Sequence, residues 1–293
     1  MSRKSLAFVL SVLLIATCLH TNALADWPNG QPTKYFQLPD KTPLGMDVYN
    51  SVIPGIVPPV GVGKYLADDF PCTTPGPITD IHIWGSWLHD VLPVNAAGAP
   101  DPSAVAFKLS IHEDIPATPD SPSRPGATLW ERIVPPGSFK VVPAVQVPDG
   151  EGFYNPNTGE FVRAADKVIW QYNFTIPTTD QPFFQKGTAA NPVIYWLDVL
   201  AAPQDPNAIF GWKTRDPNPQ NPGGGHFLDD AVWGDGFFGI GGSPTGWQDL
   251  RYPSGHPYAG QSIDLSFALT TIPEPASFSL VGIGSLLLLK RRK

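Results

Sequence analysis

Adjacent acidic side chains are the first feature of this sequence that could do chemistry. Asp68 is followed by Asp69, and Asp229 by Asp230, the second pair lying just after a Gly-rich segment. Carboxylate oxygens are the ligands that Ca²⁺ prefers in proteins. The sequence therefore marks Asp229 and Asp230 as candidates for a calcium site. The alternative is that these aspartates bracket turns, as aspartate commonly does.

The segment 216–227 also alternates Asp and Asn, as calcium-binding loops do. Its sixth position is Asn221 where an EF-hand requires Gly, and its twelfth is Phe227 where an EF-hand requires Glu. The segment is therefore not an EF-hand. No cofactor is predicted for the chain; Ca²⁺, which its paired acids could supply with oxygen ligands, is the alternative.

Catalytic motifs are weak throughout the chain. The histidines His82, His226 and His256 have no local partner at metal-ligand spacing. Residues 234–239 fit G-x-G-x-x-G by letter, but no strand–helix–strand pattern surrounds them. Ser86 lacks the second glycine of a nucleophile elbow. These observations predict a protein that is not an enzyme.

Tryptophans are the best local indication of a ligand. Indole rings exposed on a β-sandwich could stack on sugar rings, and the candidates here are Trp84, Trp87, Trp212 and Trp233. The alternative is that these large side chains fill the core. Trp84 and Trp87 lie three residues apart, so they face opposite sides of a regular strand unless a bulge at Gly85 re-aims one of them.

Alternating apolar and polar residues predict the elements that must position these side chains. The alternation is clear over 105–112, 168–176 and 263–269, and no stretch shows the apolar spacing of a long amphipathic helix. Further strands are predicted over 64–70, 78–87, 128–134, 139–147, 193–200, 209–213 and 227–233.

This pattern predicts an all-β fold, an antiparallel β-sandwich of jelly-roll type with long Pro/Gly-rich loops. One domain over residues 26–271 is expected. The alternative is two smaller β-domains divided in the Pro-rich segment 114–125. The Gly-rich loops 216–225 and 234–246 are the expected places for a site, because loops carry function on a rigid scaffold.

Charge and cysteine content narrow the range of partners. The formal net charge is −7, and the basic residues at the two ends leave the segment between them more acidic still. Such a surface repels nucleic acid and anionic lipid and favours a cation, a neutral sugar or a basic partner. Beyond residue 25 the chain has only Cys72, so this segment cannot close an internal disulfide.

The N-terminus has the order of a secretory signal peptide. Basic residues at 3 and 4 precede an apolar run over 6–16 and a small-residue end at 23–25. Cleavage is predicted between Ala25 and Asp26. An N-terminal anchor and a lipoprotein signal at Cys18 are the alternatives.

The C-terminus, 272–293, has an equally ordered pattern. Pro273, Glu274 and Pro275 precede an apolar stretch over 276–289 and a basic end over 290–293. As a helix the apolar stretch would reach about 21 Å, which is marginal for a ~30 Å bilayer core. The pattern predicts a membrane helix that resides in the inner membrane only transiently, with its basic end on the cytoplasmic side.

This tail resembles the PEP-CTERM sorting signals of bacteria that make extracellular polysaccharide. The resemblance implies that an exosortase-type transpeptidase recognises Pro273, Glu274 and Pro275, removes the tail and delivers the protein to the cell surface or extracellular matrix. An ordinary C-terminal membrane anchor is the alternative.

Most of residues 64–270 is similar to a family of exported bacterial β-domains of unknown function. The segments that carry this resemblance are LADDF at 66–70, TDIHIWGSW at 79–87, FGWK at 210–213, DDAVW at 229–233 and GQSIDL at 260–265. The resemblance implies an all-β fold and export from the cell. It does not indicate which activity the protein has.

Together these features predict an exported structural or interaction protein of the cell surface or extracellular matrix, for which extracellular polysaccharide is a candidate ligand. A secreted carbohydrate-active enzyme and a calcium-stabilised adhesin are the alternatives. An enzyme would need two carboxylates converging in a cleft.

Overall fold

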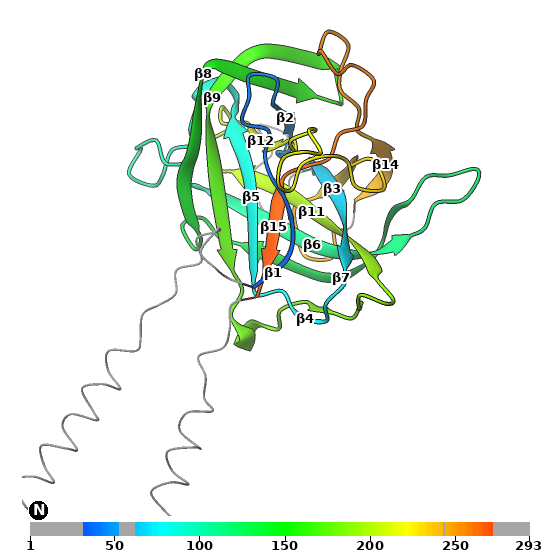
Figure 1. Cartoon of the computed structure of the whole chain (residues 1–293). Helices are drawn as coiled ribbons and strands as arrows, with labels where there is room; N and C mark the ends of the chain where they lie inside the picture. Colours follow the sequence, from blue (N-terminus) through cyan, green and yellow to red (C-terminus); the bar gives the residue numbers. More distant parts are fainter. Residues whose placement is uncertain (1–31, 53–61, 243, 272–293) are drawn as a thin grey trace, which may run out of the picture.

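The computed structural model describes residues 32–52, 62–242 and 244–271 (Figure 1). The predicted signal peptide, its cleavage point between Ala25 and Asp26, and the sorting motif 273–275 lie outside the described residues. Within the described ranges no helix is long and apolar enough to cross a membrane. The predicted membrane segment 276–289 also lies outside them.

The chain folds into two facing β-sheets (Figure 1). The seven-stranded sheet has the order β1 (Thr33–Gln37), β15 (Phe267–Thr270), β5 (Asp80–Trp87), β12 (Phe210–Lys213), β2 (Met46–Tyr49), β8 (Lys140–Asn155) and β9 (Glu160–Thr175). The six-stranded sheet has the order β14 (Thr245–Asp249), β13 (Val232–Phe237), β3 (Val62–Cys72), β11 (Val193–Pro203), β6 (Val105–Ile115) and β7 (Arg124–Val134).

Three short pieces complete the described secondary structure: the strand pair β4 (Gly76–Pro77) and β10 (Phe184–Gln185), and the 3₁₀ turns η1 (Leu88–Asp90) and η2 (Thr178–Asp180). Strand pairs are antiparallel except β2 with β8, which run parallel. The predicted all-β sandwich is confirmed.

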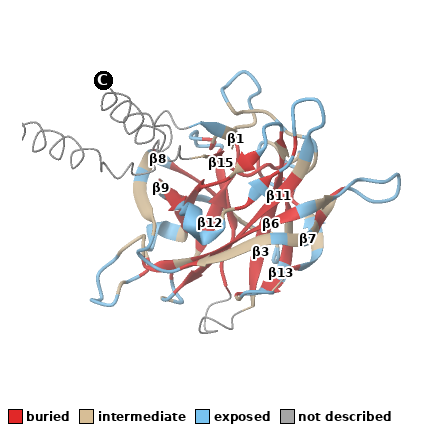
Figure 2. Cartoon of the chain, turned by 90° about the horizontal axis from the view of Figure 1, so that it is seen from below, coloured by how far each residue is buried: buried red, intermediate tan, exposed pale blue. Residues whose placement is uncertain are grey.

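The alternation read from the sequence places the core between the sheets. On β6, Val105, Phe107, Leu109 and Ile111 are all fully buried. Phe107 makes edge-to-face contacts with Phe174 and Phe210, with ring centroids 5.2 and 5.3 Å from its own. Aromatic pairs in this geometry add to the free energy that burial contributes. Figure 2 shows the buried residues running through the strands of both sheets, with exposure confined mainly to the loops.

Several predicted strand boundaries were wrong for a physical reason. The strand expected over 227–233 is β13 and begins only at Val232, because Leu228 has a φ of 43° and interrupts extended backbone. Similarly, the strand expected over 263–269 is β15 and begins at Phe267. Just before it, Asp264 turns its carboxylate to the 215–227 loop.

The Pro-rich segment 114–125 is the end of the β6–β7 hairpin. Asp114 pairs with Pro125 and Ile115 with Arg124 within one sheet. The segment therefore joins two neighbouring strands of the six-stranded sheet.

Five strands of the seven-stranded sheet close into a ring. Register shifts between Gln146 and Glu151 bend the long β8–β9 hairpin. Beyond the bend, β8 pairs with β2, while the other end of β9 pairs with β5. Because β12 joins β5 to β2, the pairings β5–β12–β2–β8–β9–β5 form a closed circuit. This five-strand ring has an interior of its own, separate from the core between the sheets.

Candidate functional site

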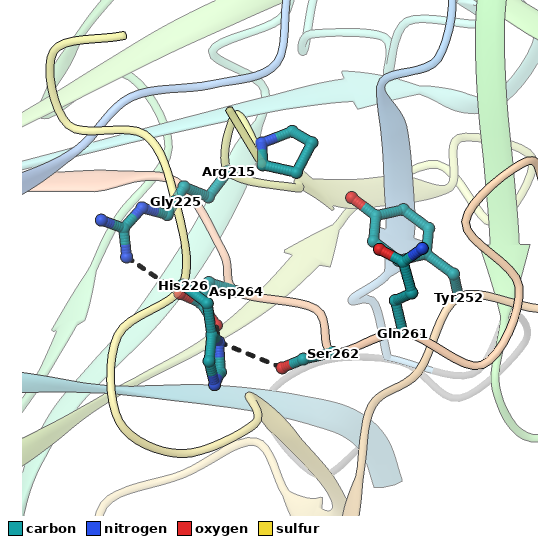
Figure 3. Close-up of a pocket in the computed structure, with 8 residues that line it drawn as sticks. Arg215, Gly225, His226, Tyr252, Gln261, Ser262 and Asp264 are labelled. Carbon is teal, nitrogen blue, oxygen red and sulfur yellow. Dashed lines mark hydrogen bonds and ion pairs between the residues drawn. The ribbon is translucent and has the colours of Figure 1, made fainter. Parts of the chain in front are cut away.

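A pocket opens where the Gly-rich loop after β12 meets the segment that precedes β15. Its volume is about 160 Å³. The lining residues with polar side chains are Arg215, His226, Tyr252, Gln261, Ser262 and Asp264 (Figure 3). The loop 216–225 was expected from the sequence to carry a site, and it forms one wall.

The Gly-rich loop is held by its own side chains. Asp216 accepts hydrogen bonds from the Asn218 backbone N–H at 2.9 Å and from the Asn221 side-chain amide at 2.6 Å. Gly224 packs so closely that a Cβ there would lie 2.2 Å from the Asn218 carbonyl oxygen. The alternating Asp and Asn residues that resemble a calcium loop therefore fold the backbone on itself, as Asx turns do.

Arg215 fastens this loop to the sandwich. Its Nε donates to the Gly223 carbonyl at 2.8 Å and its Nη2 to the Gly224 carbonyl at 3.0 Å. Its Nη1 donates to Gln37 and forms an ion pair with Asp264 at 2.9 Å. With its donors engaged in this way and its side chain 9% exposed, Arg215 is a structural cation at the base of the pocket.

Asp264 is the carboxylate around which the pocket is organised. Besides Arg215, it accepts the Phe227 N–H at 2.8 Å and contacts His226 Nδ1 at 2.6 Å. The hydrogen bond to Asp264 raises the pKa of His226. Since Nδ1 is taken, the Nε2 edge of this 45% exposed side chain is the part of His226 left for a ligand.

Ser262, His226 and Asp264 form a group that resembles a catalytic triad by composition only. Ser262 Oγ lies 3.1 Å from His226 Nδ1, the same nitrogen that Asp264 contacts. A Ser-His-Asp relay needs the serine and the carboxylate on different ring nitrogens. The geometry therefore does not activate Ser262 as a nucleophile.

The tryptophans predicted to stack on a ligand occupy other places. Trp84, Trp87 and Trp212 are 3%, 0% and 0% exposed, so they present no ring face to a sugar. Trp87 donates to the Tyr172 hydroxyl at 2.9 Å and Trp212 to the Ser266 carbonyl at 2.7 Å, which satisfies their indole N–H groups in the core. This burial corrects the stacking role expected for the three.

One expectation about these rings agrees with the structure. Trp84 and Trp87 belong to different buried clusters on the two faces of β5, as their spacing indicated. Trp233 is partly buried against the core, and the Lys64 ammonium lies 4.7 Å from the centre of its ring.

The predicted acidic pair does not converge on a metal-binding arrangement. Asp230 forms an ion pair with the Arg251 guanidinium. Burial, with a smaller effect from the nearby charge of Asp229, raises the pKa of Asp69. Among the described residues, one group of three metal-ligating side chains lies within 4.8 Å, and it consists of Asp47, Glu151 and Asp166.

The other histidines and the cysteine are dispersed. His82 is fully buried between Asp80 and Asn173. His256 contacts the Leu44 carbonyl and stacks on Tyr252, with ring centroids 4.5 Å apart. Cys72 is buried as a free thiol. None of them joins His226 at the pocket.

Sequence reasoning missed Arg215, Ser262 and Asp264 as pocket residues. Arg215 and Asp264 lie 49 positions apart and meet only in the folded chain. The available signal was compositional: a lone arginine beside a Gly-rich loop and an aspartate within an otherwise apolar alternation.

The fold and the pocket define a two-sheet all-β domain with a small polar cavity that a buried Arg–Asp pair lines. Residues 33–270 match the family described as Domain of unknown function (DUF7901), and the chain belongs to that family. No curated protein and no solved structure matches the chain.

Proposed function

We propose that this protein is an exported interaction module of the cell surface or extracellular matrix, and that the pocket beside His226 binds one small hydroxylated unit such as a sugar residue of extracellular polysaccharide. The predicted signal peptide and PEP-CTERM-like tail support the proposed location at the cell surface or in the extracellular matrix. The exposed imidazole of His226 beside Ser262 and Gln261 carries the binding proposal.

The chemistry of the pocket suits a hydroxylated ligand. His226, Ser262 and Gln261 offer both hydrogen-bond donors and acceptors, which a sugar hydroxyl requires. The cavity, about 160 Å³, is smaller than the roughly 300–1,000 Å³ of sites for drug-sized ligands. A single polar unit at the end or branch of a polymer is the ligand that this size favours.

Binding is favoured over hydrolysis. Glycoside hydrolysis uses two carboxylates that flank the bond to be cleaved. Asp264 is the one carboxylate lining this pocket, and Arg215 and His226 already engage it. The shared Nδ1 contact likewise leaves Ser262 without a general base.

Calorimetric titration with a panel of neutral, acidic and aminated saccharides tests the proposal. One saccharide class is expected to bind saturably. His226→Asn is expected to weaken that binding about tenfold, the effect of losing roughly 1.4 kcal/mol of contact energy. The matched control is His89→Asn, an exposed histidine outside the pocket, which should bind like the parent. If no saccharide binds, or if both variants bind equally, the proposal is wrong.

A further inference from the structure

The interior of the five-strand ring contains a polar cluster, to which each strand contributes one side chain. These are Asp47 on β2, Ser86 on β5, Glu151 on β8, Asp166 on β9 and Lys213 on β12. All five are between 0% and 1% exposed. Val48, Trp87 and Trp212, which neighbour Asp47, Ser86 and Lys213, lie in the core between the sheets, so alternation along β2, β5 and β12 directs these three polar residues into the ring. Contacts with Lys213 and Asp47 place Glu151 and Asp166 beside them.

The contacts inside the ring leave most of the negative charge uncompensated. Lys213 Nζ contacts Glu151 Oε2 and lies 3.6 Å from Asp47 Oδ2. Ser86 Oγ donates to Glu151 Oε1 at 3.1 Å. No hydrogen bond reaches either carboxylate oxygen of Asp47 or of Asp166. One ammonium group therefore faces three buried carboxylates, two of which receive no donor.

Burying an ionised carboxylate without partners costs several kcal/mol, so a group like this normally holds a counter-charge. A second positive charge is what the ring interior lacks.

We propose that the ring interior is a structural site for a hard divalent cation, Ca²⁺ in the first place, with Asp47, Glu151 and Asp166 as its ligands. A doubly charged ion together with Lys213 balances the three carboxylates. The donor set is all oxygen, which selects Ca²⁺, Mg²⁺ or Mn²⁺ over the metals that prefer imidazole or thiolate.

The spacing of the ligands suits calcium. One oxygen from each residue can be chosen so that all three lie within 4.8 Å of one another. Two oxygens bound to the same Ca²⁺ can be up to about 4.6–5.2 Å apart, twice the Ca–O distance.

Such an ion would fasten the bent hairpin to the rest of the ring. Its ligands come from β2, β8 and β9, and the parallel contact between β2 and β8 consists of three residue pairs. The interior is narrow here, since a Cβ on Gly211 of β12 would lie 2.7 Å from the Asp47 Cβ. Because every ligand is buried, the ion would be bound as the ring closes during folding.

This site differs from the acidic pair Asp229–Asp230 that the sequence suggested, and it shares no residue with the pocket beside His226. The two proposals therefore fail independently. A chain that binds no cation could still bind a saccharide, and a chain that binds no saccharide could still bind a cation.

The test is a thermal unfolding series on the full chain, unfolded in urea with EDTA and refolded with or without CaCl₂. At a Ca²⁺ concentration about 100-fold above the dissociation constant, the Tm is expected to rise by roughly 5–10 °C. Calorimetric titration of the EDTA-refolded chain with CaCl₂ should give about one site per chain, and MgCl₂ and MnCl₂ are titrated in parallel.

Asp166→Asn should abolish the Ca²⁺-dependent rise in Tm, and Asp47→Asn provides a second variant should the first fail to fold. Asp69→Asn is the matched control, because Asp69 is also a fully buried aspartate whose oxygens receive no hydrogen bond, and it should retain the full rise. Asp229→Asn should retain it too. The proposal is overturned if no divalent cation raises the Tm of the parent chain, which is the result expected if protons neutralise the ring. It is overturned equally if the rise survives in both ring variants.

Discussion

The ring interior and the pocket beside His226 both bury carboxylates, but they compensate the negative charge differently. Each contains one buried cation, and the two cations, Lys213 and Arg215, are two residues apart at the end of β12. In the pocket, Asp264 receives a guanidinium, an imidazole and a backbone N–H. In the ring, Asp47 and Asp166 receive no hydrogen bond. All of these carboxylates are buried, so burial does not separate the two regions. The number of hydrogen-bond donors that reach each carboxylate does: Asp264 is neutralised by its neighbours, whereas the ring aspartates lack a counter-charge.

The largest effect is expected from Lys213→Met, which removes the ring's one ammonium and keeps the length of the side chain. Removing one partner of a buried ion pair typically costs about 3–5 kcal/mol, so the free energy of unfolding in EDTA should fall by that amount. Urea denaturation measures it. Added CaCl₂ should recover part of the loss, since the ion would then be the main positive charge among three carboxylates.

Lys64→Met is the control for that measurement. Lys64 is also buried, but its partner Asp235 is 56% exposed, and pairs of this kind contribute about 0–1 kcal/mol. If the two methionine variants lose the same stability, the ring carboxylates are compensated in another way, and the contrast between the two regions fails.

A smaller effect, about 3 kcal/mol, is expected from Arg215→Met at the pocket. The variant would leave the Gly223 and Gly224 carbonyls without their donor and detach the Gly-rich loop from Asp264. Urea denaturation gives the energy, and limited proteolysis should show new cleavage within 216–225. Because the pocket has a single carboxylate, CaCl₂ should restore nothing. Recovery with calcium would mean that the pocket, too, holds a cation.

The sandwich could be predicted from the sequence because one face of each strand meets a core. Val105 to Ile111 on β6 alternate without interruption, and each apolar member is buried. The prediction failed where a side chain bonds out of register. The strand expected to start at Ile263 begins later because Asp264 turns toward the 215–227 loop. Contacts between segments distant in sequence carry no local signal.

The sites were less accessible to sequence reasoning for the same reason. Glu151 and Asp166 pair across the β8–β9 hairpin, but Asp47 joins them from β2, far earlier in the chain, so the three acids form no local motif. The tryptophans suggested a sugar-stacking surface from residue type alone, and three of them fill the core instead. The loop 216–225 was recognisable from its glycines and prolines, although not the arginine that anchors it.

Asp69 provides a test that depends on pH, because it is a buried carboxylate whose oxygens contact no cation. Burial and the nearby charges of Asp229, Asp264 and Asp114 raise its pKa to about 9. The folded chain therefore binds this proton more tightly than the unfolded chain, whose aspartate pKa is about 3.9. Stability from this group is fully present below pH ~4 and is lost as the pH rises toward ~9.

Asp69→Asn mimics the protonated form, so its advantage over the parent should be near zero at pH 4 and reach at least about 1 kcal/mol at pH 8. Tm measurements of both chains from pH 4 to pH 9 would show this as two diverging curves. Parallel curves would mean that a partner compensates the charge of Asp69. The number of hydrogen-bond donors at a buried carboxylate would then not predict whether its charge is compensated.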